Sequence, residues 1–354
     1  MTRVMGLVSV ILLLLGPGIV GLGAGDAAGQ QLINGAGATF PYPIYSKWFD
    51  EYTRVDGSVR FNYQSIGSGG GIRQVTEQTV DFGATDGPMT DDQLKKAPRP
   101  LLHVPTVLGA VVATYNLPGD VRLRFTPELL ADIFLGKVTT WNDAKLAEVN
   151  PGVALPKLPI VVVHRSDGSG TTFIWVDYLS KVSKEWETRV GRGTSVKWPV
   201  GLGGKGNEGV AGQVKNTPGA IGYVKLAYAT KNRLPAAPVR NAAGKFVEPT
   251  IASTAAAAAV AAKSLPADFR VSITNPPGDD AYPIASFTWL LVYRDQVDET
   301  KGKALVRFLW WATHEGQKYA ADLLYAPLPP QVVKQVETAL SQITFKGKPL
   351  LAAR

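Results

Sequence analysis

Three glycine-rich loops, each opening an amphipathic helix, constrain the fold of this chain more than any other feature. They are residues 35–40 (GAGATF), 66–71 (IGSGGG) and 165–172 (RSDGSGTT), called loops 1, 2 and 3 below. Loops 2 and 3 also follow segments with the pattern of strands: 59–64 alternates in polarity, and 160–163 is wholly apolar. Strand, loop and helix in this order predict an α/β fold.

The rest of the chain continues this alternation of short apolar runs and amphipathic helical stretches. An alanine-rich stretch at 251–262 predicts a packed helix, because alanine is the best helix former. Thr126 followed by Pro127 is typical of a capped helix start. Further strands are expected at 80–84, 104–115, 160–164, 221–224 and 287–293, and helices at 43–52, 72–78, 127–134, 172–182 and 303–324.

The chain has 354 residues, enough for two domains with a core each. No long glycine–serine or charged linker divides it, which suggests that the chain crosses between the domains more than once. At the N-terminus, Arg3 precedes an apolar run from Val4 to Leu15, and small residues follow up to Ala28. This pattern predicts a cleaved signal peptide at 1–28 and export to the periplasm. A retained membrane anchor is the alternative, but the run is short for a bilayer span.

Composition excludes several classes of site. The chain has no cysteine, so disulfides, thiolate nucleophiles and iron–sulfur clusters are excluded, and its three histidines are far apart in sequence. The net charge of +8 is dispersed, without the basic block or stripe that a nucleic-acid partner would need. We therefore expect no metal, no cofactor and no nucleic acid.

The three loops carry the chemistry of an anion site. Glycine lets the backbone approach a ligand closely, and a helix start offers unpaired N–H groups and a positive dipole end. Thr39 and Ser68 add hydroxyls in loops 1 and 2, and Arg165 adds a fixed cationic fork in loop 3, with Asp167 placed to orient it. A single such loop is usually only a helix cap. Three together indicate a small, multiply charged anion.

Asp86 narrows the kind of anion. It ends the segment 80–86 (VDFGATD), whose pattern predicts a strand running into a loop. A carboxylate suits an anion site only if the anion carries a proton, which hydrogen phosphate does and sulfate does not. The alternative is that Asp86 merely caps a helix near 89–95.

Three other functions are weaker alternatives. Residues 201–206 (GLGGKG) match the dinucleotide fingerprint, but Pro199 precedes them and the expected acidic residue is missing. A secreted phosphatase using the same loops would need a nucleophile with a base, or a metal cluster, and we find neither. Binding of sulfate or molybdate is a third possibility, against which Asp86 argues.

The motifs also resemble a known family. The chain is similar to the periplasmic phosphate-binding proteins of phosphate-specific ABC transporters, the PstS family. The resemblance covers nearly the whole chain after residue 28 and rests on the segments 35–41, 63–68, 80–86, 166–171, 196–199, 201–207 and 218–224.

The resemblance implies a set of ligand contacts and a two-lobed fold. Departures from the family pattern lie at Gly69, Thr85 and Gly87, beside the contacts. The fold implied is the α/β, two-lobed periplasmic binding protein fold with a hinge, type II-like, with lobe I formed by 29–110 and 284–354 and lobe II by 111–283. Phosphate contacts are implied for Thr39, Phe40 (through its backbone), Ser68, Asp86, Arg165, Ser169, Gly170 and Thr171.

The resemblance also implies partners. The protein would be a monomer that binds inorganic phosphate without catalysing a reaction. It would deliver the phosphate to the permease subunits of an ABC importer, and so act indirectly with the ATPase subunits.

Overall fold

The computed structural model describes residues 30–351, so the predicted signal peptide lies outside the described residues. Its centre is one mixed sheet with the strand order β2-β1-β3-β10-β4-β7-β5-β6. The strands, in that order, are Val59–Ser65, Gln31–Gly37, Phe82–Thr85, Ala285–Tyr293, Leu101–Tyr115, Ala220–Lys225, Val161–Arg165 and Leu202–Gly204.

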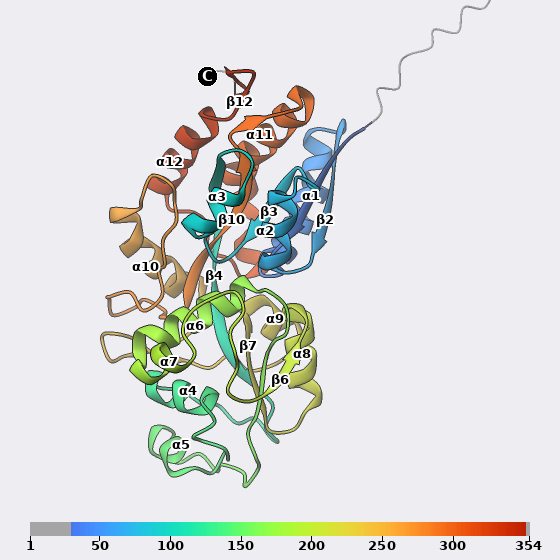
Figure 1. Ribbon diagram of the computed structural model, residues 1–354. Coiled ribbons are helices and arrows are strands. Elements are labelled where there is room, and N and C mark those ends of the chain that lie inside the picture. Colours follow the sequence, from blue (N-terminus) through green and yellow to red (C-terminus); the bar gives the residue numbers. More distant parts are fainter. Residues whose placement is uncertain (1–29, 352–354) are drawn as a thin grey trace, which may run out of the picture.

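Strand β4 joins the two halves of this sheet. Its residues 101–110 pair antiparallel with β10, and its residues 111–115 pair antiparallel with β7. Figure 1 shows the consequence: two bodies lie one above the other, and β4 runs from one into the other. We call the body with β1–β3 and β10 lobe I, the body with β5–β7 lobe II, and the change of partners between Ala110 and Val111 the junction. The residue limits of the lobes stay a prediction.

Helices cover both halves of the sheet (Figure 1). On lobe I lie α1 (Tyr42–Val55), α2 (Ser68–Thr76), α3 (Asp91–Lys96), α11 (Glu299–Thr313) and α12 (Pro330–Ser341), while α10 (Ile251–Ala261) packs on β4 and β10. Lobe II carries α4 (Pro127–Phe134), α5 (Ala144–Val149), α6 (Gly170–Val182), α7 (Lys184–Arg189), α8 (Gly206–Asn216) and α9 (Leu226–Lys231).

Short elements complete the fold. Two small sheets lie outside the central one, and single-turn 3₁₀ segments follow α10 and α11. No helix among residues 30–351 is long and apolar enough to cross a membrane. The short strands are β8 (Val239–Arg240), β9 (Phe246–Val247), β11 (Asp295–Gln296), β12 (Thr344–Phe345) and β13 (Lys348–Pro349), and the 3₁₀ segments are Ala262–Ser264, Glu315–Tyr319 and Ala321–Leu323.

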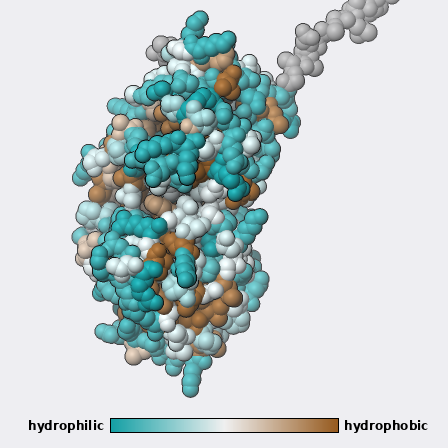
Figure 2. Space-filling view, viewed as in Figure 1, coloured by the Kyte–Doolittle hydropathy of each residue, from teal (hydrophilic) through white to brown (hydrophobic). Residues whose placement is uncertain are grey.

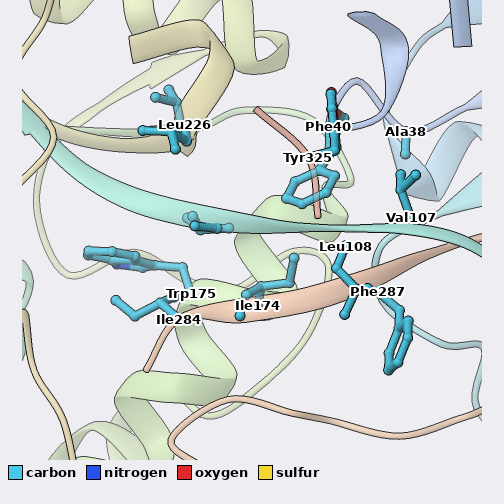
Figure 3. Close-up of a cluster of buried hydrophobic side chains, with 14 of the residues drawn as sticks. Ala38, Phe40, Val107, Leu108, Ile174, Trp175, Leu226, Ile284, Phe287 and Tyr325 are labelled. Atoms are coloured by element: carbon cyan, nitrogen blue, oxygen red, sulfur yellow. The ribbon is translucent and has the colours of Figure 1, made fainter. Parts of the chain in front are cut away.

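The hydrophobic core is continuous across the junction. Figure 3 shows Ile174 and Trp175 from lobe II close to Leu108, Ile284 and Phe287 around β4 and β10, and each of these side chains is buried. Strands β4 and β10 are rich in apolar residues and buried along almost their whole length, because both of their faces are covered.

One predicted helix is longer than the observed one. The pattern at 303–324 predicts a single helix, but α11 ends at Thr313 and His314 departs from helical geometry, with φ −118° and ψ −96°. Two 3₁₀ turns follow, and they fold back so that the Gly316 carbonyl accepts a hydrogen bond from the Trp48 indole at 2.7 Å. That tertiary bond joins residues 268 positions apart in sequence, so the local pattern could not reveal it.

Candidate anion-binding site

The three glycine-rich loops meet between the lobes. Loop 1 begins in the last residues of β1, loop 2 follows β2, and loop 3 connects β5 to α6. The Gly69 amide donates to the Gly168 carbonyl at 2.8 Å, so loops 2 and 3 are in direct contact. Gly67 has φ +84°, and a Cβ there would lie 2.3 Å from the Asp167 carboxylate. Glycine is therefore required at this position, both by the backbone and by the space.

The eight residues predicted as ligand contacts come together at this meeting point, and all are buried. Figure 2 shows pale residues of intermediate hydropathy along the seam between the lobes on the face in view. The structure shows that the eight predicted residues lie together. Their contact with a ligand stays a prediction.

The serine hydroxyls of loops 2 and 3 accept hydrogen bonds from backbone amides. Ser68 Oγ accepts from the Gly170 amide at 3.0 Å and from the Asp86 amide at 3.2 Å. Ser169 is the N-cap of α6, and its Oγ accepts from the Thr172 amide at 3.0 Å. Ser68 thus links β3, loop 2 and the start of α6.

The threonine hydroxyls of loops 1 and 3 are held by Asn207. Its Nδ2 donates to Thr39 Oγ1 at 2.7 Å and to Thr171 Oγ1 at 3.0 Å, and its backbone amide donates to Thr39 Oγ1 at 3.2 Å. Thr171 Oγ1 also accepts from Arg165 Nη1 at 3.4 Å. Asn207 therefore ties the two loops together through the oxygens of both hydroxyls.

These hydrogen bonds determine which of the four hydroxyl protons are free to donate to a ligand. A hydroxyl has one donor and two acceptor lone pairs, and in all four residues the oxygen acts as an acceptor from nitrogen. The Ser68 hydroxyl can turn its proton to the Asp86 carboxylate, whose pKa it lowers. Among residues 30–351, no protein acceptor takes the protons of Thr39, Ser169 and Thr171. Three buried O–H donors without a protein acceptor suit an acceptor-rich ligand.

Loop 1 adds a backbone donor, the amide of Phe40. The Thr39 carbonyl accepts from the Tyr228 hydroxyl and the Phe40 carbonyl from the Tyr325 hydroxyl, both at 2.6 Å. Because a trans peptide points its C=O and N–H in opposite directions, the Phe40 amide points away from Tyr228. The two tyrosines thus fix the carbonyls of Thr39 and Phe40. The Phe40 N–H then points away from Tyr228, where it can donate to a ligand.

Arg165 supplies the charge of the site. Its side chain is 1% exposed, and Nε donates to Asp167 Oδ1 at 2.7 Å. Burial opposes ionisation of Asp167, but the hydrogen bonds and charge of Arg165 outweigh it and lower the pKa of that carboxyl. The Gly206 amide donates to the same Oδ1 at 3.0 Å. Asp167 therefore orients Arg165, as its position in the sequence predicted.

Asp86 is buried beside Ser68, and it is not the cap of the next helix. The N-cap of α3 is Thr90, so the alternative reading of Asp86 as a helix cap is wrong. Its carboxylate accepts from Thr288 Oγ1 at 2.8 Å. Burial raises the pKa of Asp86 to about 7, although the Thr288 hydrogen bond, the charge of Arg165 and the Ser68 hydroxyl lower it.

Two residues of the site were not predicted from the sequence. Asn207 stands just after the glycines at 201–206, which in the structure form β6 and the start of α8. Thr288 lies on β10, 202 residues after Asp86, and no local pattern marks it. Among the described residues, no cluster of histidine, aspartate and glutamate could hold a metal ion.

Fold and site together define the class. Two α/β lobes share one sheet, and glycine loops from both lobes enclose a set of hydrogen-bond donors between them. This is the architecture of a two-lobed solute-binding protein.

Comparison with known proteins names the family. The model of the PBP superfamily domain matches residues 23–313. The phosphate-binding protein PstS of Xylella fastidiosa strain Temecula1 is 50% identical over 309 residues, which cover 86% of this chain and 84% of the relative. The phosphate-binding protein PstS of Pasteurella multocida is 47% identical, covering 87% and 89%. The chain therefore belongs to the PstS family of phosphate-binding proteins within the PBP superfamily.

Solved structures agree on the fold. The crystal structure of an ABC-type phosphate transport receptor from Vibrio cholerae aligns with a TM-score of 0.55 and 19% identity, covering 84% of this chain and all of that one. At this identity the likeness shows the two-lobed α/β fold.

Proposed function

We propose that this protein binds inorganic phosphate reversibly in the periplasm and delivers it to an ABC importer. One observation carries the proposal: three buried hydroxyl protons, on Thr39, Ser169 and Thr171, have no acceptor in the described part of the chain, and Thr171 lies against the buried Arg165. A small tetrahedral oxyanion can accept all of these donors at once. The family of the chain supports the same ligand.

The geometry supports a set of ligand contacts. In this proposal the hydroxyls of Thr39, Ser68, Ser169 and Thr171 and the Phe40 amide surround the anion, Arg165 carries the main charge, and Asp86 accepts a hydrogen bond from the anion's O–H. Hydrogen phosphate has such a proton and sulfate has none. A buried group built to pair with a ligand hydroxyl can discriminate by about 10⁴-fold against analogues without it. The Gly170 amide, also implied as a contact by the family resemblance, already donates to Ser68 Oγ at 3.0 Å, so the anion would have to share this donor.

Binding without chemistry fits the family, whose members carry solutes for transport. The runner-up is a phosphatase that uses the same loops. Serine and threonine hydroxyls stand in the site, but their oxygens accept hydrogen bonds from N–H groups, which do not activate a nucleophile. A phosphate-release assay on phosphomonoesters separates the two functions.

Delivery requires partners at the membrane. We propose that the loaded monomer docks on the permease subunits of the importer and acts only indirectly with the ATPase subunits. The predicted signal peptide and membership in the PstS family support this location and role.

A panel of anions tests the ligand. Isothermal titration of the native protein, first dialysed free of phosphate, should give tight binding of phosphate and weak binding of sulfate and molybdate. The Asp86→Asn variant should narrow the gap between phosphate and sulfate, because a neutral amide no longer repels a fully ionised anion. A native protein that prefers sulfate would overturn the proposal, and an unchanged phosphate-to-sulfate ratio in the variant would remove Asp86 from it.

A further inference from the structure

A buried lysine lies behind loop 1, outside the set of residues that contacts the anion. Lys225 is the last residue of β7, and it is fully buried. A Cβ added at Gly109 of β4 would lie 2.6 Å from Lys225 Cε and 2.6 Å from the Phe40 ring. The lysine side chain therefore passes over β4 next to Phe40, one residue from the junction.

The ammonium group of Lys225 has few partners that could compensate for its burial. Lys225 Nζ donates to the Leu324 carbonyl at 2.5 Å and lies 4.0 Å from the centre of the Tyr325 ring and 5.9 Å from that of Phe40. No carboxylate among residues 30–351 forms an ion pair with it. An ammonium has three donors and a large desolvation cost, so one carbonyl and two ring faces compensate it only partly.

The segment that Lys225 holds also holds loop 1. Leu324 has φ +61°, a left-handed conformation that is costly for leucine and that gives its carbonyl to the lysine. Tyr325 binds the Phe40 carbonyl through its hydroxyl, and Ala326 forms two backbone hydrogen bonds with Leu108 of β4. In Figure 3, Tyr325 and Phe40 stand next to each other beside β4. Lys225 of lobe II thus supports the Phe40 loop of lobe I.

The residues that surround the anion carry little net positive charge, so a further cation nearby would help to bind a dianion. The charge of Arg165 is already paired with Asp167, and Asp86 adds a carboxylate, so a dianion entering the site meets little net positive charge. Tyr325 is the ionisable group that the described residues place against the Lys225 ammonium. The carboxylates of Asp86 and Glu208 are close enough to act on Tyr325, whose pKa is raised by burial first and then by these charges.

We propose that Lys225 is a positioning residue of the anion site that braces the Phe40 loop across the junction and takes up a proton from solvent when the anion binds. The inference rests on the proposed function. Burial lowers the pKa of Lys225 well below its ordinary value in the protein without ligand, so the side chain loses its proton easily there. A bound dianion next to Phe40 favours the charged form and draws the proton back.

The direction of the pH effect follows. In the alkaline range where only the loaded protein keeps Lys225 protonated, each binding event takes up a proton, so phosphate affinity falls as pH rises. In a variant without the lysine, phosphate affinity should no longer fall as pH rises over this range. Removing the lysine should also stabilise the protein without ligand, because a buried ammonium without a carboxylate is costly and an apolar side chain of similar length is not.

The test compares Lys225→Met with the native protein and with Lys231→Met. Lys231 is exposed at the end of α9, so its variant loses the same charge without touching the site. Phosphate is titrated calorimetrically above its second ionisation, in two buffers with different ionisation enthalpies, which gives the protons taken up per phosphate. Urea unfolding without phosphate gives the stability of each variant.

We expect the native protein and Lys231→Met to take up protons on binding. Lys225→Met should take up fewer, bind phosphate about 10- to 100-fold more weakly, and unfold at higher urea. A native protein that binds phosphate tightly without proton uptake, or a Lys225→Met protein with native affinity and uptake, would overturn the role of Lys225 and leave the proposed function intact. Failure of the native protein to bind phosphate would instead defeat the proposed function.

Discussion

At the scale of single residues, the site depends on how burial acts on charges. Arg165 is buried with a partner carboxylate, whereas Asp86 is buried with only hydroxyls and more distant charge to stabilise its ionised form. The sequence could place Asp86 and Arg165 at the meeting point of the loops because Asp86 directly follows β3 and Arg165 is the last residue of β5. It could not predict Asn207 or Thr288, whose roles depend on partners in distant segments.

The stability of the closed form without phosphate should carry the signature of Asp86, which is buried in that form. Its pKa is raised from the ordinary value of 3.8 to about 7, so below 3.8 the folded and unfolded states are both protonated, and stability falls as pH rises from there to about 7. The ionised buried carboxylate costs up to about 4 kcal/mol at pH 8. Asp86→Asn should therefore stabilise the protein more at pH 8 than at pH 5 in urea unfolding without phosphate. An equal difference at both pH values would contradict this.

Arg165 should contribute more to binding than any other charge. Arg165→Ala removes the charged partner of a desolvated ligand and should weaken phosphate binding by about 2–5 kcal/mol in calorimetry. Arg165→Lys should restore only part of this, because the planar fork is lost. Arg73→Ala, at an exposed position on α2, is the control and should bind normally. Near-normal affinity in Arg165→Ala would exclude the assignment.

At the scale of elements, the sequence predicted those helices and strands whose position depends on a local pattern of residues. Six strands of the central sheet and the helices α1, α4, α6 and α10 lie where apolar spacing, caps and alanine content placed them. Helix α2 begins at Ser68, four residues before the predicted start, because the glycines of loop 2 form its first turn. Strands β1 and β6 were not predicted. The second half of β1 is Gly-Ala-Gly and β6 is Leu-Gly-Gly, and such glycine-rich segments carry little strand signal.

The start of α6 has no room for a side chain at Gly170. A Cβ there would lie 2.5 Å from Ser68 Oγ and 2.6 Å from Asp86 Cβ. Gly170→Ala should force loops 2 and 3 apart and weaken phosphate binding by about 1–3 kcal/mol, the usual cost of overpacking. Thermal unfolding without phosphate should change less, if the lobes then separate.

The matched control is Gly212→Ala within α8, where a Cβ would meet nothing within 4 Å. This variant should bind phosphate normally and be slightly more stable, because alanine favours the helix. Equal affinities in the two variants would show that the contact between α6 and Ser68 is not needed for binding.

At the scale of the whole molecule, the ligand contacts are divided between the lobes. Thr39, Ser68 and Asp86 belong to lobe I, and Arg165, Ser169 and Thr171 to lobe II, so neither lobe alone surrounds the anion. The described structure brings the lobes together, with loops 2 and 3 in contact. Phosphate should favour this closed form, because only closure lets both sets bind at once.

Small-angle scattering measures this closure. The radius of gyration should be larger without phosphate and should decrease when phosphate is added, while Arg165→Ala should need far more phosphate for the same change. Identical radii in the two states, together with tight binding, would indicate a rigid, preformed site.

The central claim is that phosphate binds where the hydroxyls of the three loops meet, and a crystal structure of the protein with phosphate tests it most directly. The account predicts one phosphate between the lobes, within hydrogen-bond distance of the hydroxyls of Thr39, Ser68, Ser169 and Thr171 and of Arg165, with one oxygen facing Asp86. Phosphate bound elsewhere, or in this place without contact to Arg165 and Asp86, would contradict the account.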